Sequence, residues 1–225
     1  AQAVKRIYGE KAVQLAIGPA IDNGFYYDID MEKQLGQADL DKIQQEMEKI
    51  VKENLPISRS EVQRDAAIKM FEEKGEKYKV QLIKDLPEDV LITLYTQGEF
   101  TDLCAGPHVV STGKIKAIKL QNVTGAYWRG NAKNKMLQRI YGVCFPTAEE
   151  LEAHLQLLEE AKERDHRKIG KDMNLFMVDD LVGRGLPMFL PKGYTIWQEL
   201  ENYIKEKERK LGYLHVMTPC VGTVN

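Results

Sequence analysis

Residues 101–108 form a short bend that brings three reactive side chains together, and this bend most constrains the fold around it. Pro107 lacks a backbone N–H, has a fixed φ, and disfavours the helical region for the residue before it. Asp102, Cys104 and His108 therefore cannot lie on successive turns of one helix. Because an apolar run precedes them, we expect a strand that ends here and turns a carboxylate, a thiol and an imidazole into one space.

The spacing of Cys104 and His108 also has two less specific interpretations. They could be two of the four ligands of a zinc ion, or simply a buried thiol beside a surface imidazole. The chain has 3 Cys, widely spaced, which argues against a disulfide framework and favours a reducing, cytoplasmic compartment. No run of 18 or more apolar residues occurs, so we expect no membrane-spanning segment.

Charge is segregated along the chain, although the formal net charge is only −2. No acidic residue lies between Asp102 and Glu149. The basic residues of this interval, which we predict to bind the phosphates of a nucleic acid, are Lys114, Lys116, Lys119, Arg129, Lys133, Lys135 and Arg139. Trp128 lies in a loop flanked by glycines and suits stacking on an unpaired base, and the alternative is a core tryptophan.

Hydrophobic periodicity predicts an α+β fold of mixed helices and antiparallel strands. Helical spacing indicates helices over 1–8, 38–53, 65–74, 76–84 and 193–211. Alternating or β-branched runs indicate strands over 13–17, 25–29, 55–62, 90–96, 100–104, 115–123, 136–145, 173–178 and 213–218. The turn signal at 22–24 predicts that the first two strands form a hairpin.

A domain boundary is predicted after residue 145. Thr147 and Glu150 match a capping box that starts a helix. Between 159 and 171 the pattern of this helix becomes almost wholly charged, which is typical of a solvated connector. The predicted parts are a first domain over 1–145, a linker helix over 146–170 and the start of a second domain over 171–225.

Five stretches together resemble bacterial-type threonyl-tRNA synthetases, and the resemblance runs over nearly the whole chain. Each is a weak signal alone, but their occurrence in this order is specific. They are 16–28 (AIGPAIDNGFYYD), 102–108 (DLCAGPH), 125–130 (GAYWRG), 134–142 (NKMLQRIYG) and 165–170 (DHRKIG). The resemblance implies that 1–145 is most of an editing domain, which hydrolyses serine wrongly attached to threonine tRNA. Residues from about 171 would begin the antiparallel-sheet catalytic domain of a class II synthetase.

The resemblance also implies partners. They are the acceptor end of tRNA, threonine and serine as aminoacyl groups, and a second copy in a homodimer with Pro219 at the interface. An H-x-x-x-H pair is expected immediately before Ala1, and the remaining class II motifs after Asn225. We therefore expect no cofactor in this stretch and no charging of tRNA by the chain alone. ATP, Mg and a catalytic-domain Zn would belong to the full-length enzyme.

The site residues are assigned roles as follows. His108 suits a general base near neutral pH. Cys104 could be a hydrogen-bond partner, a metal ligand or a pocket wall, and Asp102 could orient His108 or hold the substrate ammonium. The resemblance adds Lys79 as a catalytic-pocket lysine and Tyr27 as a substrate-pocket tyrosine. From the residues alone these two are a surface lysine and a half-buried strand aromatic.

Two further hypotheses compete with an editing enzyme. One is a non-catalytic RNA-binding module that uses the basic interval, in which Lys119 and Arg139 could instead be internal partners of acids. The other is a zinc-stabilised structural domain built on Cys104 and His108. Because the related alanyl enzymes use zinc here and the threonyl type generally does not, we predict no metal.

Overall fold

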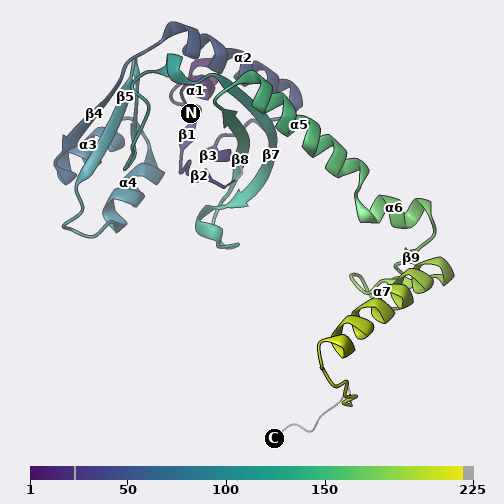
Figure 1. The fold of residues 1–225 in the computed structure, drawn as a ribbon. Coiled ribbons are helices and arrows are strands. Elements are labelled where there is room, and N and C mark those ends of the chain that lie inside the picture. Colours follow the sequence, from purple (N-terminus) through teal and green to yellow (C-terminus); the bar gives the residue numbers. More distant parts are fainter. Residues whose placement is uncertain (23, 220–225) are drawn as a thin grey trace, which may run out of the picture. The chain divides into compact units, whose positions relative to one another are not determined.

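The computed structural model describes residues 1–22 and 24–219. The chain divides into two compact units between His154 and Leu155, and each is described by itself (Figure 1). Within the described ranges, no helix combines the length and apolar character needed to cross a membrane. Both units mix helices with antiparallel strands, so the predicted α+β class is confirmed.

The first unit contains a large antiparallel sheet. Its strands are β1 (Gln14–Leu15), β2 (Ala20–Ile21), β3 (Gly24–Asp30), β7 (Ala117–Tyr127) and β8 (Met136–Phe145). The order is β1-β3-β8-β7, and β2 also pairs with β3, which confirms the predicted hairpin. Helices α1 (Gln2–Tyr8) and α2 (Gln37–Glu53) bury Val4, Leu40 and Ile43 in one core with Ile29 of β3 and Ile140 of β8.

A smaller sheet lies in the same unit. It consists of β4 (Ile57–Val62), β5 (Ile92–Gln97) and β6 (Phe100–Leu103), with β5 in the centre, and helices α3 (Arg64–Glu73) and α4 (Lys77–Asp85) pack on it. Leu94 of β5 is buried with Phe71 and Ile83 of these helices. Because side chains alternate along a strand, Thr93 and Tyr95 point to the opposite face.

A third cluster of buried side chains joins helix α4 to the large sheet. Tyr78 of α4 contacts Trp128 edge-on, with ring centroids 4.9 Å apart. Trp128 begins a short 3-10 turn, η2 (Trp128–Gly130), and a second such turn, η1 (Thr112–Lys114), precedes β7. Ala16 and Leu137 complete the cluster. Helix α4 is therefore packed against both sheets, which matters for the site described below.

The predicted linker helix is two helices. Helix α5 (Ala148–Glu163) ends before Arg164, and α6 (His166–Asp172) begins after Asp165. The Asp165 carboxylate accepts the Arg167 N–H at 2.8 Å, which caps α6 and interrupts the continuous charged pattern. The start of α5 carries half of the predicted capping box, since the Glu150 N–H donates to the Thr147 hydroxyl at 3.2 Å.

In the second unit, β9 (Phe176–Met177) pairs antiparallel with β10 (Met188–Phe189), and the long helix α7 (Pro191–Lys210) follows. The strand predicted over 213–218 is wrong, because 213–219 adopts no regular structure. A strand needs a hydrogen-bonding neighbour, and no described residue pairs with this segment. Pro219 is exposed, and its place at a dimer interface stays a prediction.

Candidate functional site

The hairpin of β5 and β6 places the first site residues. Its register sets Tyr95 directly opposite Asp102 and Leu94 opposite Leu103. Opposed residues of an antiparallel pair point to the same face. Leu103 therefore packs with the core under α3 and α4, whereas Tyr95 and Asp102 face the other side.

Asp102 forms one ion pair and accepts two hydrogen bonds, from groups on three different elements. Lys79 of helix α4 lies with its Nζ 2.6 Å from Asp102 Oδ1, and the Tyr27 hydroxyl of β3 donates to Oδ2. The Leu103 N–H donates to Oδ1 at 2.8 Å. Lys79 also donates to the Tyr27 hydroxyl at 3.0 Å. These three side chains, Tyr27, Lys79 and Asp102, are called the buried trio below.

Lys79 is the most buried member of the trio, whereas Tyr27 and Asp102 are half-buried. Lys79 is only 3% exposed, so its ammonium depends on Asp102 for charge compensation. Burial, followed by the negative charge of Asp102, raises the pKa of Tyr27 well above its ordinary value. The hydroxyl therefore stays protonated and donates to Asp102. The interpretation of Lys79 as a plain surface lysine is wrong, and Tyr27 is held by its hydroxyl rather than only by its ring.

Cys104 and His108 follow at the bend. The Cys104 sulfur accepts the Gly106 N–H at 3.5 Å. Gly106 has φ 73°, and a Cβ there would come within 1.9 Å of the Tyr95 hydroxyl oxygen, so the turn requires glycine. The His108 imidazole stacks on the Tyr95 ring, with centroids 3.9 Å apart and an interplanar angle of 27°.

The suggestion that Asp102 orients His108 finds no geometric support. No hydrogen bond joins them in the described residues, because the carboxylate is occupied by Lys79, Tyr27 and the Leu103 N–H. Partial burial lowers the pKa of His108, and the charge of Asp102 opposes this only in part. The imidazole is therefore neutral at physiological pH and available as a proton acceptor.

One cavity of about 640 Å³ contains the whole set. Tyr27, Lys79, Asp102, Cys104 and His108 all line it, together with apolar residues of both sheets. Ala1, at the start of α1, lines the same cavity. The five residues assigned to the pocket from the sequence thus come together from β3, α4, β6 and the bend after it.

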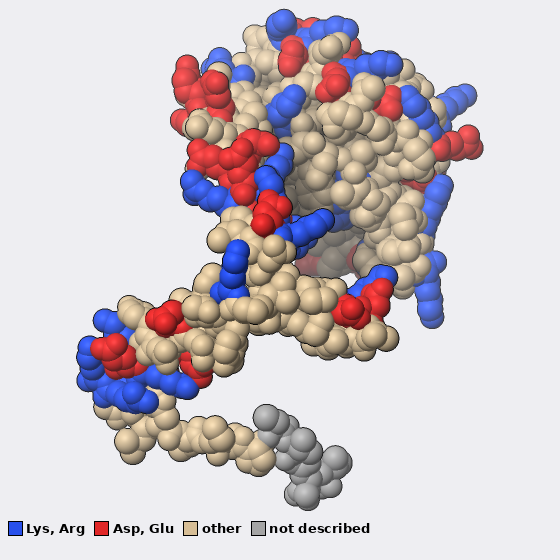
Figure 2. Space-filling view, turned by 90° about the vertical axis from the view of Figure 1, so that its right-hand side faces the viewer, with Lys and Arg blue, Asp and Glu red and all other residues tan. Residues whose placement is uncertain are grey.

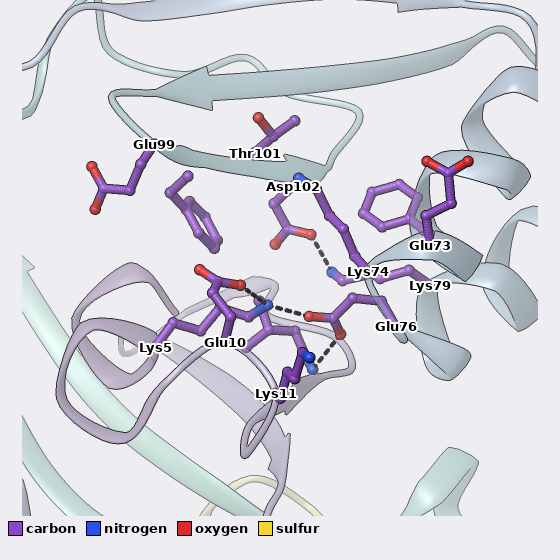
Figure 3. A pocket seen from close by; sticks show the side chains of 13 residues that line it. Lys5, Glu10, Lys11, Glu73, Lys74, Glu76, Lys79, Glu99, Thr101 and Asp102 are labelled. Atoms are coloured by element: carbon purple, nitrogen blue, oxygen red, sulfur yellow. Dashed lines mark hydrogen bonds and ion pairs between the residues drawn. The ribbon is translucent and has the colours of Figure 1, made fainter.

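A second cavity of about 390 Å³ adjoins the first and shares Lys79, Phe100 and Asp102 with it. Figure 3 shows three ion pairs in this cavity, one between Lys79 and Asp102 and two from Lys5 to Glu10 and Glu76. The Glu76 carboxylate also accepts the Leu15 N–H at 2.8 Å. Glu76 directly precedes α4, so it fastens the start of the helix that carries Lys79 to α1 and β1.

The described residues do not form a zinc site. Cys104 and His108 supply two donors, whereas a tetrahedral zinc site takes three or four protein ligands. No cluster of three or more His, Cys, Asp or Glu side chains suited to a metal occurs in residues 1–22 and 24–219.

The basic interval is partly neutralised by acids from elsewhere. Arg139 forms a bidentate pair with Asp28, at 2.6 and 2.8 Å, and Asp28 is 2% exposed. Arg129 pairs with Asp85. Lys135 lies 2.6 Å from Asp30. Arg139 therefore balances a buried acid, whereas Arg129 and Lys135 remain largely exposed in their ion pairs. Phosphate binding by these three residues remains a prediction.

Trp128 is a core residue rather than a stacking platform. Its ring is 6% exposed and packs on Tyr78, and its Nε1 donates to Gln81 at 3.1 Å. Lys114, Lys116 and Lys133 remain exposed, and Lys119 is half-buried. The side of the first unit seen in Figure 2 shows Lys and Arg mixed with Asp and Glu around its edges.

Tyr95 was missed in the sequence, although a signal for it exists. A two-residue turn at Gly98 and Glu99 pairs Gln97 with Phe100. Counting back along this hairpin places Tyr95 opposite Asp102. The hairpin register therefore predicts that any residue at position 95 shares a face with the carboxylate.

Comparisons with known proteins show which family the chain resembles. A family model described as the threonyl and alanyl tRNA synthetase second additional domain matches residues 92–141. A threonine–tRNA ligase of a Geobacillus species is 59% identical over 224 residues, which is 100% of this chain and 34% of that protein. The ligases of Carboxydothermus hydrogenoformans and Clostridioides difficile are 60% and 56% identical over 221 residues, 98% of this chain and 34% of each. The chain spans about a third of the length of these curated relatives.

Proposed function

The chain belongs to the threonine–tRNA ligase family along its whole length, and from this premise we propose that its larger cavity hydrolyses seryl-tRNA. The observation that carries the proposal is the gathering of a neutral imidazole, a thiol and a buried ammonium around one space of about 640 Å³. An aminoacyl ester is already activated, so positioned groups of this kind suffice for its hydrolysis.

The reaction is the addition of water to the ester carbonyl, followed by loss of the tRNA ribose oxygen. His108 accepts a proton from the attacking water and returns it to the departing oxygen, which leaves free serine and uncharged tRNA. The low pKa of His108, caused mainly by burial, keeps the imidazole neutral for the first of these transfers. Lys79 supplies positive charge towards the oxygen that becomes negative in the intermediate.

The cavity wall can account for the choice of serine. Serine and threonine differ by one methyl group, which changes binding in a pocket by only about 1–3 kcal/mol. A narrow editing site can reject threonine by a clash instead. Tyr27 is fixed for this role, because its hydroxyl is tied to Asp102 and its ring lies against Gly18, where no Cβ would fit.

The proposal is tested in a chimera in which this chain replaces the matching stretch of the Geobacillus ligase. His108→Ala should slow deacylation of seryl-tRNA by about 10²–10⁴-fold, because a general base is lost. His154→Ala is the matched control, since His154 packs on Phe145 away from the cavity and should leave the rate within about twofold. A rate that survives His108→Ala unchanged, or equal hydrolysis of seryl- and threonyl-tRNA by the unaltered chimera, contradicts the proposal.

For tRNA binding we propose a smaller basic set than the sequence suggested, namely Lys114, Lys116, Lys119 and Lys133. Lys116→Glu should weaken tRNA binding and flatten its dependence on salt by about one unit of slope. Lys49→Glu on α2, also exposed but outside the basic interval, is the control. Equal slopes for both variants would place the tRNA contact elsewhere.

A whole protein that contains this chain is proposed to join threonine to tRNA, as the name of its relatives states. ATP, Mg and a catalytic Zn would serve that ligation, and no described residue is assigned to any of them. The cytoplasmic location and the homodimer belong to this same proposal.

A further inference from the structure

The orientation of His108 needs a physical cause, because an imidazole acts as a base only when its lone pair faces the water. The Asp102 carboxylate is engaged by Tyr27 and Lys79, so it does not hold the His108 imidazole. The contact that the structure does show is the stack on Tyr95, with centroids 3.9 Å apart. We propose that Tyr95 is the positioning residue that orients the His108 imidazole in the cavity.

Tyr95 is well placed to be rigid. It lies in the central strand of the small sheet, paired with Arg59 of β4 on one side and Asp102 of β6 on the other. The central strand is hydrogen-bonded to a neighbour along each edge, so the backbone around Tyr95 is held from both sides. The side of the sheet that carries Tyr95 is the one that faces the cavity.

The same side chain also sets the turn that leads to His108. The Tyr95 hydroxyl lies so close to Gly106 that a Cβ there would be 1.9 Å away. The ring therefore supports the bend at one end and the imidazole along its face. One rigid aromatic residue thus fixes both the path of the chain and the plane of the base.

Two substitutions at position 95 test the ring and the hydroxyl of Tyr95 separately. Tyr95→Phe keeps the face on which His108 stacks, whereas Tyr95→Leu removes it. Tyr141→Leu is the control, because Tyr141 makes its aromatic contact with Tyr26 in the large sheet, with ring centroids 5.9 Å apart, and not with His108. If Tyr95 did not position His108, the NMR signals of the His108 imidazole would be the same in Tyr95→Phe and Tyr95→Leu.

The direct test is proton NMR of the 225-residue chain, which has only 4 His. His108→Ala identifies the imidazole signals of His108. These signals should be shifted upfield by the Tyr95 ring and should show nuclear Overhauser contacts to it. The upfield shift should remain in Tyr95→Phe and in Tyr141→Leu and disappear in Tyr95→Leu. Absence of the contacts in the unsubstituted chain overturns the proposal without any variant having to fold.

The second readout rests on the proposed function and uses the chimera. Tyr95→Leu should lower kcat for seryl-tRNA deacylation at least about tenfold with KM within about twofold, and Tyr95→Phe should restore kcat. If His108→Ala has no effect, the editing proposal fails, and the NMR result alone decides the role of Tyr95. If His108→Ala is inactive but Tyr95→Leu keeps the full rate, Tyr95 does not position the base.

Discussion

Replacement of Glu76 by Gln measures how much the ion pair at the start of α4 contributes to the free energy of unfolding. Glu76 is 3% exposed and Lys5 is 6% exposed, so their ion pair is shielded from water (Figure 3). Gln has the same shape and keeps an oxygen that accepts the Leu15 N–H. The substitution therefore removes the negative charge and little else.

The magnitude follows from what remains around Lys5. Removal of one partner from a buried ion pair costs about 3–5 kcal/mol, because the other charge is left without compensation. Lys5 keeps Glu10 at 2.7 Å, but Glu10 is exposed, so we expect a loss of about 3 kcal/mol for Glu76→Gln. Glu76→Ala also leaves the Leu15 N–H without an acceptor, which adds about 1–2 kcal/mol.

The assay is urea unfolding followed by tryptophan fluorescence. The chain has 2 Trp, so a Trp197→Phe background leaves the buried Trp128 as the reporter of the first unit. Glu72→Gln is the control, because its pair with Lys84 is exposed and 3.4 Å long, and it should change stability by less than about 0.5 kcal/mol.

A second substitution identifies the cause. Lys5→Met added to Glu76→Gln should restore about 2 kcal/mol, because the unpaired charge is then gone. The reasoning is refuted if Glu76→Gln costs no more than the Glu72→Gln control, or if the double variant is no more stable than Glu76→Gln alone.

Three shorter predictions use the same chain. Arg139→Ala should destabilise the chain by about 3 kcal/mol in the urea assay, because the buried Asp28 carboxylate loses its partner. An unchanged urea midpoint would mean that Arg139 is free to bind tRNA. Gly106→Ala should lower deacylation by the chimera at least about tenfold, since the left-handed turn and the close Tyr95 contact both exclude a Cβ, and a normal rate would contradict this geometry. The hydrogen bonds of Arg6, with help from Gln2, lower the pKa of Glu99 to about 2, below its unfolded value of about 4.3. This contribution to stability is present above about pH 5 and is lost as the pH falls towards 2. Arg6→Met should therefore reduce the loss of stability between about pH 5 and 2, measured by circular dichroism during acid titration. Identical titrations of the variant and the unsubstituted chain would refute the prediction.

Local pattern was sufficient for most helices and strands, but not for the partners of polar residues. The alternation along β8 indicates a strand, yet nothing local shows that Arg139 lies opposite Asp28 of β3. That pairing depends on the register of two strands that are 111 positions apart. The basic interval therefore looked free for phosphate although part of it serves the interior.

Trp128 and Lys79 are two further residues whose burial local sequence patterns do not predict. Glycines around Trp128 indicated an exposed loop, but β7 runs on to Tyr127 and the ring reaches helix α4, a tertiary contact that periodicity does not contain. Lys79 looked like a surface residue by its type, and only the resemblance assigned it to the pocket. Its burial depends on the ion pair with Asp102 of strand β6, which no local pattern shows.

The buried trio also limits the routes by which this cavity can evolve. A substitution of Tyr27, Lys79 or Asp102 leaves a buried charge or hydroxyl without its partner, so fitness falls before any new specificity can be selected. Leu82 and Phe100 line the same cavity and carry no charge, so a volume-conserving replacement of either leaves no buried charge unpaired. Lineages that acquire a different substrate preference should therefore accumulate replacements in the apolar wall first, with the three polar positions changing together or not at all.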